Sequence, residues 1–103
     1  MFYGARRLPI RIEDQLLSHL KSVATAKQRR GEGFLLSWSD SAEVGRGRSS
    51  VWIHQMTDLH YKFEDGTPVK IDMALLEELN LESTRPRGIE LSEATLMRWH
   101  MRD

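Results

Sequence analysis

Two stretches of sequence decide the fold of this chain: KQRRGEGFLLSWSD, residues 27–40, and GRGRSSVWIHQMTDLHYKF, residues 45–63. Each contains an apolar run rich in residues that favour β-strands, at 34–39 and at 50–55. Each run also carries a tryptophan, Trp38 in the first and Trp52 in the second. Because the residues between the runs are polar or glycine, the pattern predicts a β-hairpin with a long loop.

The segment before the hairpin predicts an edge strand followed by a long helix. Leu8, Ile10 and Ile12 alternate with other residues, which is the period of a half-buried strand, and Pro9 is compatible only with a sheet edge or with a strand start. Apolar residues then recur at helical spacing, and a basic last turn precedes two glycines. We therefore expect a helix over residues 14–30.

The segment after the hairpin predicts a further strand pair. Residues 59–64 alternate between apolar and polar side chains, and Asp65 and Gly66 form a strong turn signal. We expect Val69–Ile71 to pair back across this turn.

The last third of the chain predicts two short helices around a short strand. Asp72 is the expected N-cap of a helix that runs through Leu79, and Ile89–Leu91 is the expected strand. Ser92 is expected to cap a final helix that bears Leu96, Trp99 and Met101. The whole chain, residues 1–103, is thus predicted to be a single α+β domain. Its mixed, mostly antiparallel sheet would have about four to six strands, with a long N-terminal helix and two shorter C-terminal helices.

Composition narrows the function classes. The 103 residues suit one domain, and the absence of cysteine excludes a disulfide framework, a thiolate zinc site and a cysteine nucleophile. The apolar runs are too short for a transmembrane helix, and charges occupy the N-terminal positions that a signal peptide needs to be apolar. We expect an intracellular, cytoplasmic protein that uses no cofactor.

The charges are unevenly distributed, although the formal net charge is +0. Residues 1–30 hold seven Lys and Arg against two acidic residues, and residues 31–103 hold eight against thirteen. Such asymmetry can mark a binding face, or it can be a solvated surface whose opposing halves fold close together.

The ordered motifs resemble a known family. The resemblance rests on five motifs in this order: KQRRGEGF, SWSD, GRGRSSVWIH, LHYKF and RPRG. With these motifs the sequence resembles a family of small uncharacterised proteins from actinobacteria and from bacteriophages of those hosts. The resemblance covers roughly residues 8–91 and leaves the expected C-terminal helix, residues 91–103, outside. It implies a fold and a source, and it implies no activity.

Some members of that family are labelled ATP-dependent DNA ligases, and this sequence does not support the label. A nucleotidyl-transferring ligase needs a lysine in a K-x-D-G motif to carry the adenylate. The nearest match is KFEDG at 62–66, which is one residue too long and turns Lys62 to a different face relative to Asp65. A chain of 103 residues also lacks room for a nucleotidyltransferase domain. We predict that the protein is not an enzyme.

Other site patterns were weighed against plainer structural roles. His54 and His60 could share a sheet face and hold a metal with Asp58 or Glu64, but no metal-ligand spacing supports this, so no metal site is predicted. Serines near His54 lack a nucleophile elbow and a third catalytic member. The GRGRSS loop, residues 45–50, could cradle an anion through its backbone N–H groups or be a plain hairpin loop.

The leading hypothesis is a small protein-interaction module. It would bind a protein partner, a host protein if phage-encoded or a second copy of itself, through an exposed sheet edge or the C-terminal helix. The residues predicted to carry binding are Arg46, Arg48, Trp99 and Met101. The alternative is a small DNA- or RNA-binding protein that uses a basic helix end and the Arg-Gly loop, with Lys27, Arg29, Arg30, Arg46 and Arg48 as its contacts.

Overall fold

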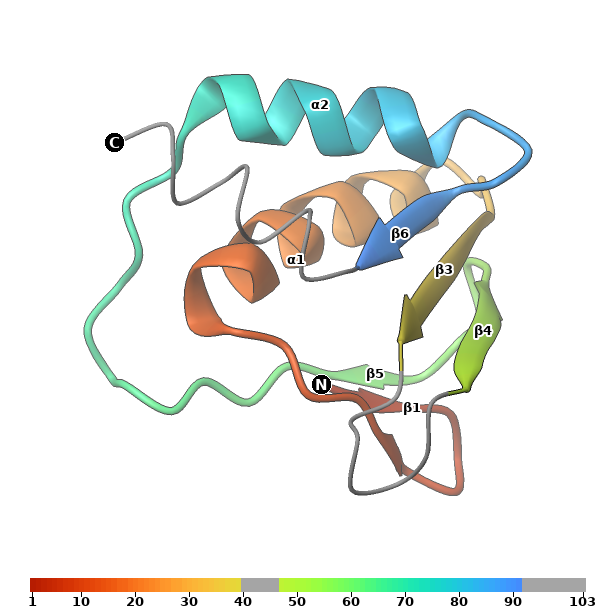
Figure 1. Cartoon of the computed structure of the whole chain (residues 1–103), viewed down its shortest axis with the longest axis horizontal. Coiled ribbons are helices and arrows are strands. Elements are labelled where there is room, and N and C mark those ends of the chain that lie inside the picture. The colour runs from red at the N-terminus through yellow and green to blue at the C-terminus, as the bar shows by residue number, and fades with distance from the viewer. Residues whose placement is uncertain (40–46, 92–103) are drawn as a thin grey trace.

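Six strands and two helices make up the part of the chain that the structure, a computed structural model, describes, residues 1–39 and 47–91 (Figure 1). In chain order they are β1 (Phe2–Tyr3), β2 (Leu8–Pro9), α1 (Asp14–Arg29), β3 (Phe34–Ser39), β4 (Arg48–Ile53), β5 (Leu59–His60), α2 (Met73–Ser83) and β6 (Ile89–Leu91). The strands form two separate three-stranded sheets, ordered β2-β1-β5 and β4-β3-β6. The α+β class is therefore confirmed, while the prediction of one sheet is wrong. The helix expected after Ser92 lies outside the described residues.

The predicted hairpin forms two of the three strands of the second sheet, with β3 in the centre and β4 at an edge. β3 and β4 are antiparallel, with Phe34 opposite Ile53 and Ser39 opposite Arg48, and β6 lies parallel to β3 on its other side. Gly88 allows this close parallel approach, because its φ is +67° and a Cβ atom there would strike the carbonyl oxygen of Leu35.

The first sheet was missed as a unit because its strands are very short. β1 pairs with both β2 and β5, so that Phe2 lies opposite Pro9 on one side and His60 on the other. The strands expected over 8–12 and 59–64 shrink to two residues each. A two-residue strand has no periodicity of its own, and its pairing across the length of the chain leaves no local signal.

The strand predicted at Val69–Ile71 does not form. Instead the carboxylate of Asp14, in the first turn of α1, accepts hydrogen bonds from the backbone N–H groups of Glu64 and Asp65, both at 3.0 Å. These bonds tie the predicted turn to the helix, and Pro68 removes a donor from the residues that would pair back.

Aromatic residues before this turn also pack towards α1. The ring of Phe63 lies 5.8 Å from the Lys21 ammonium, and Tyr61 packs against the hydrophobic core. Burial of the Tyr61 hydroxyl, which has no hydrogen-bond partner among the described residues, raises the pKa of Tyr61 to about 12.

The two helices pack together through a buried histidine. The Nδ1–H of His19 in α1 donates to the Gln15 carbonyl at 2.6 Å, and its Nε2 accepts from the Asp72 N–H at 2.8 Å. The carboxylate of Asp72 accepts in turn from the N–H groups of Ala74 and Leu75, so the predicted N-cap of α2 is confirmed. The helix predicted over 14–30 is observed one residue shorter.

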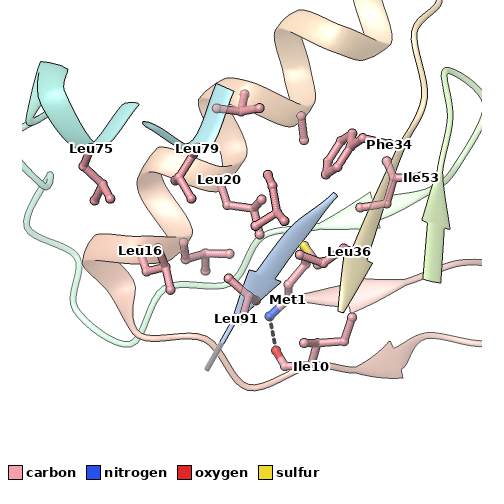
Figure 2. Close-up of a cluster of buried hydrophobic side chains, with 14 residues drawn as sticks. Met1, Ile10, Leu16, Leu20, Phe34, Leu36, Ile53, Leu75, Leu79 and Leu91 are labelled. Atoms are coloured by element: carbon pink, nitrogen blue, oxygen red, sulfur yellow. Dashed lines mark hydrogen bonds between the residues drawn. The ribbon is translucent and has the colours of Figure 1, made fainter. Parts of the chain in front are cut away.

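One hydrophobic core joins both sheets to both helices (Figure 2). Leu16 and Leu20 of α1 and Leu79 of α2 meet the inner faces of β3, β4 and β6, and all are almost fully buried. Met1 joins this core, and its ammonium donates to the Ile10 carbonyl at 3.0 Å. Burial lowers the pKa of that amine. Neither of the helices in the described ranges is long and apolar enough to cross a membrane.

Candidate protein-binding face of the β3–β4 hairpin

The outward side of the hairpin carries a distinct set of side chains, which we call the outer hairpin face. Because successive strand residues point to opposite sides, the buried residues of β3 and β4 alternate with outward ones. The outer hairpin face consists of Leu35, Ser37 and Ser39 on β3 and of Arg48, Ser50 and Trp52 on β4. All of the β4 members are exposed.

The centre of this face is held by a cross-strand hydrogen bond. Ser37 and Ser50 are opposite each other, and their hydroxyl oxygens lie 2.7 Å apart. This bond pins the register of the two strands, which places Leu35 opposite Trp52 at one end and Ser39 opposite Arg48 at the other.

Trp52 is the most prominent apolar group of the face. Its side chain is 54% exposed, and its indole lies against Gly33. A Cβ atom on Gly33 would come within 2.6 to 2.9 Å of three indole atoms. The glycine thus makes room for a large aromatic ring that remains half open to solvent.

The edge of the sheet at β4 is also open along part of its length. Within the described residues β4 pairs only with β3, so its other side has no strand partner. The Tyr3 hydroxyl donates to the Trp52 carbonyl at 2.8 Å and thereby covers one position of this edge. Since alternate residues of an edge strand direct their backbone groups to the same side, Ser50 and Arg48 present theirs beside that covered position.

The turn that follows β4 is firmly fixed. The Gln28 side-chain amide of α1 donates to the carbonyls of His54 and Thr57, both at 3.0 Å, and the Thr57 hydroxyl accepts from the His54 N–H. Nδ1 of His54 accepts from the Met56 N–H at 3.0 Å. Met56 is 76% exposed at this turn, which adds a second exposed apolar side chain shortly after Trp52.

The predicted basic contacts among the described residues fall into two separate groups, and the first group lies at the end of α1. Lys27 is 4% exposed, and its ammonium lies 3.4 Å from the same Glu32 oxygen that binds Arg30 at 3.2 Å. The Arg30 and Lys27 hydrogen bonds lower the pKa of Glu32, so this carboxylate stays ionised and offsets their charge. Arg29 ends α1 and is exposed.

Arg48 lies at the opposite end of the hairpin from these residues. It pairs with Ser39, whereas α1 leads into the hairpin at Phe34, five residues away along β3. At about 3.4 Å per residue this is a separation of roughly 17 Å along the strand. Arg46, Trp99 and Met101, also predicted as binding residues, lie outside the described residues, as does Gly45 of the GRGRSS segment. The last three residues of that segment, 48–50, are not loop but the start of β4.

The histidines that could have bound a metal are engaged elsewhere. Nδ1 of His54 accepts from the backbone, and Nδ1 of His60 accepts from the Arg7 guanidinium at 3.1 Å. Over residues 1–39 and 47–91, no three His, Asp or Glu side chains cluster as metal ligands.

Sequence reasoning did not single out Trp52 as exposed, because its alternation with Val51 and Ile53 is equally typical of a core position. The signal that could have identified it is Gly33, the small residue that lies under the indole.

The chain is therefore a small α+β domain whose hairpin exposes a supported tryptophan beside an open sheet edge. The model of a domain of unknown function, DUF7882, matches residues 1–94, and the chain belongs to this family. No curated protein and no solved structure matches it. The match contains the range of roughly residues 8–91 on which the resemblance was drawn, and residues 95–103 lie beyond it.

Proposed function

We propose that this protein is a non-enzymatic interaction module that binds an extended segment of a partner protein along β4. The observation that carries the proposal is Trp52, a half-exposed indole that lies against Gly33, beside a sheet edge that no strand of the described residues covers. Tryptophan and arginine are the residues that most often dominate binding energy at protein interfaces. An exposed sheet edge, in turn, accepts an extended peptide through main-chain hydrogen bonds.

The side chains of the face define the chemistry of the bound segment. Arg48 and Trp52 lie on the same side of β4, four residues apart, so about 13 Å separates them along the strand. A peptide strand added beside β4 would have the same two-residue alternation of side chains, so its side chains four residues apart would contact both Arg48 and Trp52. The matching segment therefore carries an apolar side chain for Trp52 and an acidic side chain, four residues away, for Arg48.

We also propose, on the sequence resemblance alone, that the source is an actinobacterium or one of its phages. If the protein is phage-encoded, the partner is a host protein in the host cytoplasm. A second copy of the chain is the other partner that the sequence hypothesis allows, and the experiment below distinguishes it.

Peptide selection tests the proposal directly. Random dodecapeptides displayed on phage would be selected on the wild-type protein, and binding of the enriched peptides would be measured by fluorescence anisotropy. We expect enriched peptides to share an acidic and an apolar residue at i and i+4. We expect their affinity to fall at least about tenfold in both Trp52→Ser and Arg48→Glu.

A charge swap and a matched control make the test specific. Replacing the acidic residue of the peptide with lysine should restore binding to Arg48→Glu and abolish binding to the wild type. Met73→Ser removes another exposed apolar side chain, 62% exposed on α2, and should leave the affinity unchanged. Urea unfolding of each variant would confirm that it is folded.

Two results would overturn the proposal. One is a set of selected peptides that bind Trp52→Ser and Arg48→Glu as tightly as the wild type. The other is a wild-type dimer in sedimentation that dissociates in Trp52→Ser, because the face would then be occupied by a second copy.

Nucleic-acid binding through Lys27, Arg29, Arg30, Arg46 and Arg48 stays a prediction, and no contact among the described residues favours it. Lys27 is buried, and Arg30 shares a carboxylate with it. Its test is an affinity for DNA or RNA that falls steeply with added salt.

A further inference from the structure

The β1–β2 hairpin contains the one described residue other than glycine with a left-handed backbone. The loop of residues 4–7 joins the two strands, and φ is +74° at Gly4 and +55° at Arg7. A residue with a side chain is less stable in the left-handed region than in the right-handed one. Such residues persist at functional sites when the surrounding structure holds them in that conformation. Glycine or asparagine would serve the turn at lower cost, so the presence of arginine needs a reason.

The surroundings of Arg7 fix its guanidinium group in place. Its central carbon lies 4.6 Å from the centroid of the Phe2 ring, and one of its nitrogens donates to Nδ1 of His60 at 3.1 Å. The Phe2 and His60 rings are in turn 5.5 Å apart. Arginine has five N–H donors and no acceptor, so this contact uses one donor and leaves the others for a ligand.

The same contact sets the tautomer of His60. Since Arg7 can only donate, Nδ1 of His60 must be the acceptor, and a neutral ring then carries its proton on Nε2. The cluster therefore offers donors from two side chains, a guanidinium and an imidazole Nε2–H.

These groups line a hollow. Its volume is about 340 Å³, and its walls include Phe2, Gly4, Arg7, Leu59 and His60. The volume falls in the range of small-ligand sites, about 300–1,000 Å³. A Cβ placed on Gly4 would meet no atom within 4 Å outside Gly4 and its two chain neighbours.

Asp58 determines which anions suit the hollow. It is exposed and lines the same hollow as Arg7 and His60, and its carbonyl accepts from the Gly4 N–H at 2.8 Å, so its carboxylate adds a negative charge to the rim. A phosphate with two charges is disfavoured there, while a single carboxylate with a neighbouring ammonium satisfies both signs. The rings and Leu59 offer an apolar wall to a third group.

We propose that this hollow binds a small zwitterion of the α-amino-acid class. The carboxylate lies on Arg7 and His60, the ammonium faces Asp58, and an apolar side chain rests against Phe2 and Leu59. This site is separate from the outer hairpin face and does not depend on its function.

Amide chemical shifts of the full chain, titrated with L-leucine, acetate and inorganic phosphate, test the proposal. L-leucine should give saturable shifts at Gly4 and Leu59 with a dissociation constant on the order of 1 mM or lower. Acetate should bind at least about tenfold more weakly, and phosphate more weakly still. In Asp58→Asn, affinity for L-leucine should fall and affinity for phosphate should rise.

Arg7→Asn is the decisive variant, because asparagine tolerates the left-handed backbone and should keep the hairpin folded. Its melting temperature should stay within a few degrees of wild type while the L-leucine shifts disappear. Arg6→Gln, in the same loop, is the matched control and should bind as the wild type does. The proposal is overturned if the wild type shows no saturable L-leucine shift, if phosphate binds more tightly than L-leucine, or if both arginine variants bind equally.

Discussion

Replacing Gly88 with alanine should be among the most destabilising single changes in the described part of the chain. Two separate costs apply at this position. The φ of +67° costs an L-residue roughly 1–2 kcal/mol. The new Cβ would also strike the Leu35 carbonyl group, whose carbon would lie 2.8 Å away, and the neighbouring atom is backbone that cannot rotate aside.

The second cost comes from the packing of β6 against β3. Relief of the clash requires β6 to move off β3, which disturbs the pairing of Leu36 with Ile89, both fully buried. Forcing extra atoms into a packed core typically costs about 1–3 kcal/mol. We therefore expect Gly88→Ala to lower the free energy of unfolding by about 3–4 kcal/mol, a large fraction of the total for a small domain.

Two other glycines separate the two costs. Gly4 has φ +74° with nothing within 4 Å of an added Cβ, so Gly4→Ala should cost only the backbone component, about 1–2 kcal/mol. Gly66 has neither a left-handed φ nor a close neighbour, so Gly66→Ala should be neutral or slightly stabilising. Urea unfolding followed by circular dichroism would measure all three. Equal effects of Gly88→Ala and Gly4→Ala would refute the role assigned to the β3–β6 contact.

Three further predictions concern single side chains. Because the folded pKa of Tyr61 is raised to about 12, the free energy of unfolding should be constant below pH 10 and fall as pH rises towards 12. Solvent screening limits this loss to about 1 kcal/mol. Tyr61→Phe should abolish the pH dependence in alkaline urea titrations. His19→Leu leaves the Asp72 N–H without its acceptor and should cost about 2–3 kcal/mol, with faster hydrogen exchange at that amide; an unchanged exchange rate would contradict this. Gly33→Ala should displace the indole of Trp52 and weaken selected peptides without affecting L-leucine binding, as titrations of both ligands would show.

The parts of the fold that sequence predicted correctly are those with local causes. Helical spacing and a basic last turn mark α1, and the Asp72 carboxylate fixes the start of α2 by bonding N–H groups two and three residues ahead. The hairpin was also predicted. Its second strand, β4, lies two residues earlier than expected because the turn held by Gln28 begins at His54. Each of these features depends on residues close in the chain or on a strong pattern.

The parts that sequence missed depend on distant partners. The Asp65–Gly66 turn signal is real, and the Asp65 carboxylate accepts from the Thr67 N–H at 2.9 Å. However, Asp14, fifty residues earlier in the chain, takes the N–H groups that a hairpin would have used. The local sequence around the turn does not indicate that a distant carboxylate will accept these hydrogen bonds. The hollow at Arg7 was missed for the same reason, because its donors come together only when β1 pairs with β5.

The uneven charge distribution illustrates why the tryptophan carries more weight than the arginines in the proposed function. Several bases of the first thirty residues are used within the fold: Lys27 and Arg30 meet Glu32, Lys21 lies over Phe63, and Arg7 is held by His60. Each partner lies in the acidic remainder of the chain or its aromatic residues, so the two halves offset each other where they fold together. A ligand attracted by charge alone would find Lys27 and Arg30 already beside the Glu32 carboxylate. Trp52 differs, because the fold supports it from below with Gly33 and leaves its upper surface open. Tryptophan has few side-chain torsions, so an exposed indole loses little conformational entropy on binding, and this is the property that a docking residue requires.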